Sequence, residues 1–201
     1  MKSSSKDTLL MAMVVAAMAL LFYLFILARG HNYLLIGLGL VILPSLLAFV
    51  GGPPFVPTPM AVARRIVEAA ALKPGDIVYD IGCGDGRIVY LAAEKTGVKG
   101  TGVELSSVVY LLARVRTALW GSKARIKLGS FSWYNYSDAD VVFCFLLPNI
   151  LKQLEPKLKK ELKKGARVVS LIFQFESWAE REKIVFNDGG RDYNIWVYEK
   201  N

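Results

Sequence analysis

The chain has 201 residues, which suits one domain of ordinary size with an appended segment. Its apolar fraction of 54% exceeds the roughly 45–50% of typical globular proteins, and its formal net charge of +8 is compatible with nucleic acid, anionic lipid or acidic proteins as partners. The two cysteines, Cys83 and Cys144, lie far apart in apolar contexts, which argues against a disulfide or a metal pair and indicates reduced core residues of a cytosolic domain.

The apolar excess is concentrated in the first fifty residues. Residues 8–28 carry no charge and are long enough to cross a hydrocarbon core about 30 Å thick, and residues 33–50 are uncharged and just reach that length. A cleaved signal peptide and a buried core helix are the alternatives, but the apolar region of a signal peptide has only about 7 to 15 residues. We therefore expect a membrane anchor of two transmembrane helices over residues 1–52 and a second domain over residues 53–201.

The charges around the two apolar runs predict the orientation of this anchor. Lys2 and Lys6 precede the first run, Arg64 and Arg65 follow the second, and the loop between the runs carries Arg29. Because positive residues favour the cytoplasmic side, both ends of the anchor are expected there. The sequence thus predicts a multi-pass membrane protein whose second domain is cytoplasmic, with the lipid surface as the simplest explanation of the basic charge.

The second domain alternates helices with apolar runs of strand length. Thr58 and Pro59 predict a helix start, with a capping hydroxyl and then proline at the first helical position. The expected helices are 59–72, 87–95, 107–120 and 149–164, and the expected strands are 77–81, 99–105, 125–128, 139–147 and 166–173. Two more strands around "NDGG" predict a hairpin. The expected fold class is therefore α/β, a Rossmann-like doubly wound, mostly parallel sheet that ends in an antiparallel hairpin.

Three glycines and two acids interrupt the chain where the first strand meets its helix, in "VYDIGCGDGRIVYLAAE" at 78–94. In an open α/β sheet this carboxyl edge is where ligands bind, and glycines there let a ligand approach the main chain closely. A turn without a ligand would explain one or two of the glycines. The dinucleotide pattern G-x-G-x-x-G fails because Arg87 stands at its third glycine, and Asp80 and Asp85 would repel a pyrophosphate. A cofactor without phosphates, such as S-adenosylmethionine, fits better.

The second strand supports this interpretation. Glu104 closes "GTGVEL", about 20 residues after the glycine turn, where a carboxylate can accept hydrogen bonds from the two hydroxyls of a ribose. The alternative is a solvated acid at the end of a strand.

This arrangement, D-x-G-x-G-x-G followed by an acid at the second strand, resembles the seven-strand (class I) S-adenosylmethionine-dependent methyltransferases, whose sheet also ends in an antiparallel hairpin. The resemblance covers residues 54–198. More narrowly, "PPFVPTP", "YDIGCGDGRIV", "GTGVEL", "VVFCFLLPNILKQLEPKLKKELKKGARVVS" and "FQFESW" are similar to the membrane-anchored protein-lysine methyltransferases of the ATP synthase c-subunit and adenine nucleotide translocase type and their prokaryotic relatives.

The resemblance implies S-adenosylmethionine as cofactor, S-adenosylhomocysteine as product, and a membrane protein with an accessible lysine as substrate. The residues expected to bind the cofactor are Asp80, Ile81, Gly82, Cys83, Gly84, Asp85, Gly86, Glu104, Leu105, Ser130 and Phe131. Many enzymes of the class carry an acid at the position of Ser130, so here a hydroxyl, a backbone group or water would contact the adenine. Phe131 or Trp133 could cover the ring, or both could simply be core aromatics.

The end of the fourth strand, "FLLPN", supplies the residues expected beside the acceptor. Leu147, Pro148 and Asn149 are the catalytic candidates together with Leu146, although packing alone would explain the two leucines. Thr58, with the proline before it, is expected to help cover the cofactor, or to act only as a helix cap. The signature [DNS]-P-P-[YFW] of enzymes that methylate nucleobase or glutamine amino groups is missing at this strand end, which argues against a nucleic-acid acceptor.

The lysine-rich helix expected at 149–164 has a leucine stripe suited to the core and a basic remainder. Its lysines could hold the domain against anionic headgroups, each worth about 1 kcal/mol, whereas nucleic acid would call for interleaved aromatic residues. Two other functions remain open from the sequence: a lipid or quinone methyltransferase with the same cofactor site, and a non-catalytic protein that binds the cofactor.

Overall fold

The computed structural model describes residues 19–20, 22–24, 37–39, 55–95 and 97–201. The chain divides into two compact units, Met1–Leu47 and Ala48–Asn201. Across the described residues, none of the helices combines the length and apolarity needed to cross a bilayer. The multi-pass membrane localisation expected from the sequence is therefore corrected by this finding. The expected spans 8–28 and 33–50 fall almost entirely outside the described residues, and the limits 1–52 and 53–201 stay predictions.

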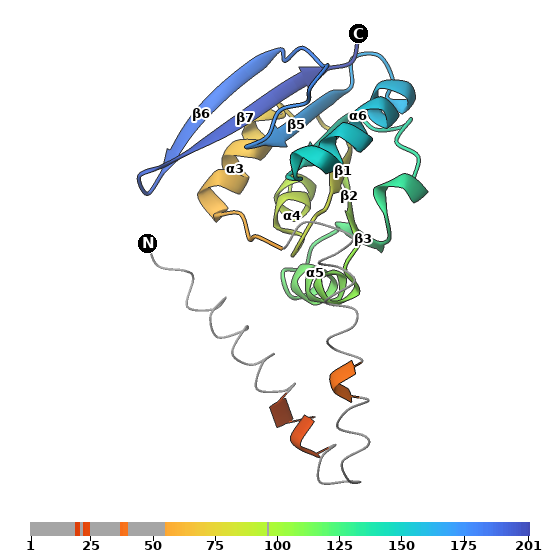
Figure 1. Ribbon diagram of the computed structural model, residues 1–201, viewed down its shortest axis with the longest axis vertical. Helices are drawn as coiled ribbons and strands as arrows, with labels where there is room; N and C mark the ends of the chain where they lie inside the picture. The colour runs from red at the N-terminus through yellow and green to blue at the C-terminus, as the bar shows by residue number, and fades with distance from the viewer. Residues whose placement is uncertain (1–18, 21, 25–36, 40–54, 96) are drawn as a thin grey trace. The chain divides into compact units, whose positions relative to one another are not determined.

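The second unit is built on a seven-stranded sheet with the order β3-β2-β1-β4-β5-β7-β6 (Figure 1). The strands are β1 (Ile77–Ile81), β2 (Lys99–Glu104), β3 (Arg125–Leu128), β4 (Val141–Cys144), β5 (Arg167–Leu171), β6 (Glu182–Asp188) and β7 (Arg191–Glu199). Strands β1 to β5 run parallel to one another, and β7 is antiparallel to both β5 and β6. The expected mostly parallel sheet with a closing hairpin is confirmed.

Helices cover both faces of this sheet. They are α3 (Met60–Ala69), α4 (Arg87–Ala93), α5 (Ser107–Leu119) and α6 (Pro148–Glu161), with a short 3-10 helix, η1 (Phe131–Trp133). Successive residues of β1 point to opposite faces: Val78 belongs to a core cluster with α3 and α4, and Tyr79 to a second cluster with the leucines of α6. A third, smaller cluster joins α5 to the glycine turn through Ala113 and Cys83.

Several expected boundaries differ from the structure, and two of these differences lie next to the carboxyl edge of the sheet. The N-cap of α3 is Pro59, whose ψ of 143° is extended, and within the described chain no side chain caps this helix. The predicted capping role of Thr58 is therefore wrong, because the chain becomes helical one residue later than a cap at Thr58 requires. Strand β4 ends at Cys144, opposite Ser170 of β5, so Leu146 and Leu147 lie in the loop before α6.

Candidate active site

The carboxyl ends of β1, β2 and β4 meet at one edge of the sheet. Ile81 at the end of β1 is paired with Val103 of β2 on one side and with Cys144 of β4 on the other. Glu104 at the end of β2 is paired with Leu128 of β3. The register thus brings the glycine turn, Glu104 and the loop after β4 to the same edge, where open α/β sheets bind their ligands.

The glycine turn adopts a backbone that other residues resist. Gly82, Gly84 and Gly86 all have positive φ, at 72°, 56° and 80°. The space around these glycines also excludes a side chain. A Cβ on Gly82 would lie 2.8 Å from Leu146 Cδ2, and one on Gly84 would lie 2.6 Å from Phe55 Cε2. The turn is therefore packed closely from two sides, with Leu146 of the β4 loop on one and Phe55 on the other.

Asp80 is the most unusual acid of this edge. Its side chain is buried, and its Oδ2 has no hydrogen-bond partner among the residues that the structure describes. Burial, with the nearby charge of Glu104, raises its pKa from the ordinary value of 3.8 to about 8, against a backbone hydrogen bond from Val89 that lowers it. A buried carboxylate with an unpaired oxygen is costly unless a ligand compensates for it.

Glu104 binds the turn to the end of β2. Its Oε2 accepts a hydrogen bond from the Gly84 N–H at 3.0 Å, and its Oε1 accepts one from the Ser106 N–H at 2.8 Å. Burial raises the pKa of Glu104, and these backbone N–H groups act in the opposite direction. Each carboxylate oxygen has a second lone pair, which leaves acceptor capacity for a ligand.

These two acids suit S-adenosylmethionine. The cofactor carries an ammonium and a sulfonium cation, which can compensate the unpaired oxygen of Asp80, and a ribose with two hydroxyls, which can donate to Glu104. A phosphate would meet the same two acids with unfavourable charge. The geometry and the charge of this edge therefore fit the predicted cofactor.

Asp85 has a different role from the one the sequence suggested. Asp85 is buried, and its carboxylate is paired with the guanidinium groups of Arg87 and Arg116, both largely buried. The expected repulsion of a pyrophosphate by Asp80 and Asp85 is corrected for Asp85, which is neutralised by its arginines. The charge that disfavours a phosphate comes from Glu104, and from Asp80 when it is ionised. Cys83 is buried as well, and its Sγ lies beside Gly102 of β2, the residue that pairs with Asp80.

The acceptor-side candidates lie at the same edge but differ in exposure. Leu146 is buried against Gly82, Leu147 is 38% exposed and forms the N-cap of α6, and Pro148 and Asn149 are exposed in the first turn of that helix. Thr58 is buried, and its carbonyl accepts a hydrogen bond from Arg87 Nη1.

The residues after β3 form a polar turn. Ser130 caps η1 by accepting from the Ser132 N–H, and its Oγ lies 2.9 Å from Ser132 Oγ. Phe131 is half-buried and packs against the α6 side of the core, whereas the Trp133 side chain is 72% exposed and lies against Gly129. Of the two aromatics, Trp133 is the one with a surface to offer a ligand or a partner.

Arg87, Arg116 and Phe55 were not among the site residues predicted from the sequence, although Phe55 lies within one of the motifs. Phe55 stands inside "PPFVPTP" and Arg87 directly follows the last glycine of the turn, so both were within the singled-out segments. Arg116 is 31 residues from Asp85, and no sequence signal indicated that they meet.

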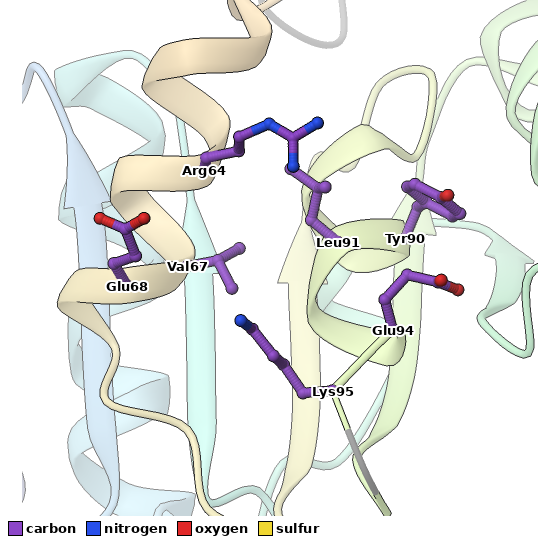
Figure 2. A pocket seen from close by; sticks show the side chains of 7 residues that line it. All are labelled: Arg64, Val67, Glu68, Tyr90, Leu91, Glu94 and Lys95. Atoms are coloured by element: carbon purple, nitrogen blue, oxygen red, sulfur yellow. The ribbon is translucent and has the colours of Figure 1, made fainter.

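A separate pocket lies away from this edge. It has a volume of about 320 Å³ and is formed by α3 and the C-terminal part of α4 with the two residues after it (Figure 2). Its lining residues are Arg64, Val67, Glu68, Tyr90, Leu91, Glu94 and Lys95. None of the residues predicted to bind cofactor or acceptor lines it.

Comparison with known proteins gives a consistent result. Residues 80–182 match the family described as the ANTKMT methyltransferase domain. A protein-lysine N-methyltransferase of Saccharolobus islandicus is 41% identical over 155 residues, which cover 76% of this chain and 96% of that protein. The adenine nucleotide translocase lysine N-methyltransferase of Mus musculus is 36% identical over 150 residues, which cover 72% of this chain and 63% of that protein.

A solved structure agrees with these relatives in fold and cofactor. An RNA methyltransferase from Salinibacter ruber in complex with S-adenosyl-L-homocysteine has a TM-score of 0.66 and 32% identity, and the match covers 72% of this chain and 93% of that chain. The fold and the site therefore define an S-adenosylmethionine-dependent methyltransferase. The chain belongs to the ANTKMT methyltransferase domain family.

Proposed function

We propose that the chain transfers the methyl group of S-adenosylmethionine to a lysine side chain of a protein, and that the acceptor is a membrane protein. The observation that carries this proposal is the similarity to a protein-lysine N-methyltransferase along nearly the whole length of that relative. The relative named for the adenine nucleotide translocase acts on a membrane protein, which supports the acceptor class.

The bound cofactor supplies an electrophilic methyl group on a sulfonium centre. The chain supplies positioning: Asp80 would hold the cationic part of the cofactor, and Glu104 would hold its ribose. Asp80 is ready for a cation because its unpaired oxygen is already desolvated. Cofactor binding therefore does not have to remove water from this oxygen of Asp80.

The acceptor side must provide a neutral lysine. With a reference pKa near 10.4, only about 1 lysine in 2,500 is neutral at pH 7. Apolar walls lower that pKa because they penalise the charged form. Leu146 and Leu147 of the β4 loop are apolar groups of this edge that can surround the amine.

The surface around the site is apolar, which supports an apolar acceptor protein. Exposed large hydrophobic side chains gather in the segments next to the carboxyl edge: Phe55, Val56, Leu105, Leu128, Trp133 and Leu147. We call these six residues the apolar rim. The helix that follows Leu105 continues this character, since Arg114 is the one charged residue among the seven exposed positions of α5. Apolar surface of this kind marks sites of interaction.

The lysines of α6 give less support to headgroup binding than the sequence suggested. Lys152, Lys157 and Lys159 of α6, and Lys163 just after its end, each form an ion pair with an acid of the same domain. Their charge is largely compensated within the fold, so the apolar rim is the stronger indication of the partner's chemistry.

A methyl-transfer assay with membranes tests the proposal. Purified chain and cofactor carrying a labelled methyl group are incubated with membranes from cells that lack the chain, and the products are separated into protein, lipid and RNA. We expect label on lysine in a protein band, lost with Asp80→Ala and retained with the matched surface control Glu68→Gln. Label in the lipid fraction would favour the lipid or quinone alternative, and label in RNA would overturn the lysine assignment. Cofactor binding without any transfer would favour a non-catalytic protein.

A further inference from the structure

The segment 55–58 contacts the glycine turn and the first residue of α4. The Phe55 ring lies against Gly84, whose N–H donates to Glu104. Three residues later, the side chain of Thr58 is buried, and its carbonyl accepts from Arg87. The segment therefore has two attachments to the glycine turn, one apolar at Phe55 and one polar at Thr58.

Arg87 connects this segment to the turn through one guanidinium group. Its Nε donates to Asp85 Oδ1 at 2.9 Å and to Oδ2 at 3.1 Å, Nη2 is paired with Asp85 Oδ2, and Nη1 donates to the Thr58 carbonyl. The Arg87 side chain is 12% exposed, and the Asp85 side chain is 2% exposed. Charge-assisted bonds shielded from water in this way are among the stronger polar contacts of a fold.

Asp85 is itself fixed from the other side. Arg116 of α5 also pairs with its carboxylate, and the Arg116 guanidinium lies over the Trp120 ring at 4.7 Å. The orientation of the Asp85 carboxylate is thus set by α5 independently of Arg87. Removal of Arg87 would take away the polar attachment of the 55–58 segment while Asp85 keeps a cationic partner.

We propose that Arg87 is a positioning residue that holds the 55–58 segment against the glycine turn, so that Phe55 forms one wall of the S-adenosylmethionine site. Only a planar, forked donor can serve the Asp85 carboxylate and the Thr58 carbonyl at once. A lysine ammonium is a single compact charge, so it can form a well-aligned hydrogen bond with the Asp85 carboxylate or with the Thr58 carbonyl, but not with both. The inference rests on the cofactor half of the proposed function and is independent of the acceptor.

Cofactor binding to the full-length chain tests this role. The dissociation constant for S-adenosylmethionine is measured by calorimetry for the wild type, Arg87→Lys, Arg87→Ala, Phe55→Ala and the double variant Arg87→Ala with Phe55→Ala. Arg65→Ala is the matched control, because Arg65 pairs with Glu68 on the exposed side of α3. We expect about ten- to hundredfold weaker binding for both Arg87 variants, the equivalent of one charge-assisted hydrogen bond. We expect wild-type affinity for Arg65→Ala.

The double variant distinguishes positioning from a general loss of structure. If Arg87 acts through Phe55, then replacing Arg87 costs little further affinity once Phe55 is gone, and the two effects are clearly less than additive. Additive effects, or wild-type affinity in Arg87→Lys, would overturn the proposal. Urea unfolding of each variant separates affinity from stability. An Arg87→Ala variant that loses stability but binds the cofactor normally would also overturn it. Because binding is measured rather than turnover, failure here leaves the lysine acceptor untouched.

Discussion

Replacement of Asp80 by asparagine should make the cofactor-free domain more stable near neutral pH and at the same time weaken cofactor binding. Burial raises the pKa of Asp80 from 3.8 to about 8, so the folded chain holds a proton that the unfolded chain has already released at neutral pH. This bound proton contributes to the free energy of unfolding. The contribution is fully present below about pH 4 and is lost as the pH rises to about 8. Since one pKa unit corresponds to about 1.4 kcal/mol, the loss is about 4 kcal/mol at pH 7.

The asparagine side chain is neutral at every pH and avoids this loss. We therefore expect the free energy of unfolding, measured by urea denaturation without cofactor, to be higher for Asp80→Asn than for the wild type by up to about 4 kcal/mol at pH 7, with little difference near pH 4. Glu104, Asp85 and Cys83 also lie near Asp80 and are present in both proteins, so the difference in the free energy of unfolding between the two proteins is the quantity to follow.

Cofactor should reverse the order of stability. A bound cation favours the ionised carboxylate, so saturating S-adenosylmethionine should stabilise the wild type more than Asp80→Asn, and its affinity for the wild type should rise with pH up to about 8. If the difference in the free energy of unfolding between the wild type and Asp80→Asn does not change between pH 4 and pH 8, the assignment of a raised pKa to Asp80 is refuted. Equal affinity of the two proteins for cofactor at pH 8 would refute its contact with the cation.

Three further predictions concern the same edge. Gly84→Ala should lower the free energy of unfolding by about 1–2 kcal/mol because residue 84 has a left-handed backbone, and urea denaturation measures this loss. The new Cβ would also meet Phe55, so we expect weaker cofactor binding by calorimetry. Unchanged binding would contradict the close packing of Phe55 against the turn. Glu104→Gln should raise the KM for S-adenosylmethionine about ten- to hundredfold with little change in kcat, and a change confined to kcat would count against ribose binding. Trp133→Ala should raise the KM for the protein acceptor at least about fivefold and leave cofactor affinity unchanged, whereas the opposite pattern would show that Trp133 covers the adenine.

The sheet could be read from the sequence because its signals are local. The central strands β1, β4 and β5 are short apolar runs, the helices have their own periodicity, and "NDGG" indicates the hairpin without help from distant residues. The same holds for the position of Asp80 and Glu104, because parallel strands place their carboxyl ends at one edge.

Features set by distant contacts could not be predicted in this way. The end of β4 at Cys144 depends on its pairing with β5, and the neutralisation of Asp85 depends on Arg116 in another helix. The start of α3 at Met60 depends on the extended ψ of Pro59, which the Thr58-Pro59 dipeptide does not specify. In each case the local signal identified the right element, and a tertiary contact decided its limit or its role.

The structure of the full chain bound to S-adenosylhomocysteine tests the central claim most directly. We predict the ligand at the carboxyl edge of β1, β2 and β4, with its amino group within hydrogen-bond distance of Asp80 and its ribose hydroxyls donating to Glu104. A ligand bound instead in the pocket between α3 and α4, or one that leaves Asp80 Oδ2 without a partner, would contradict the account.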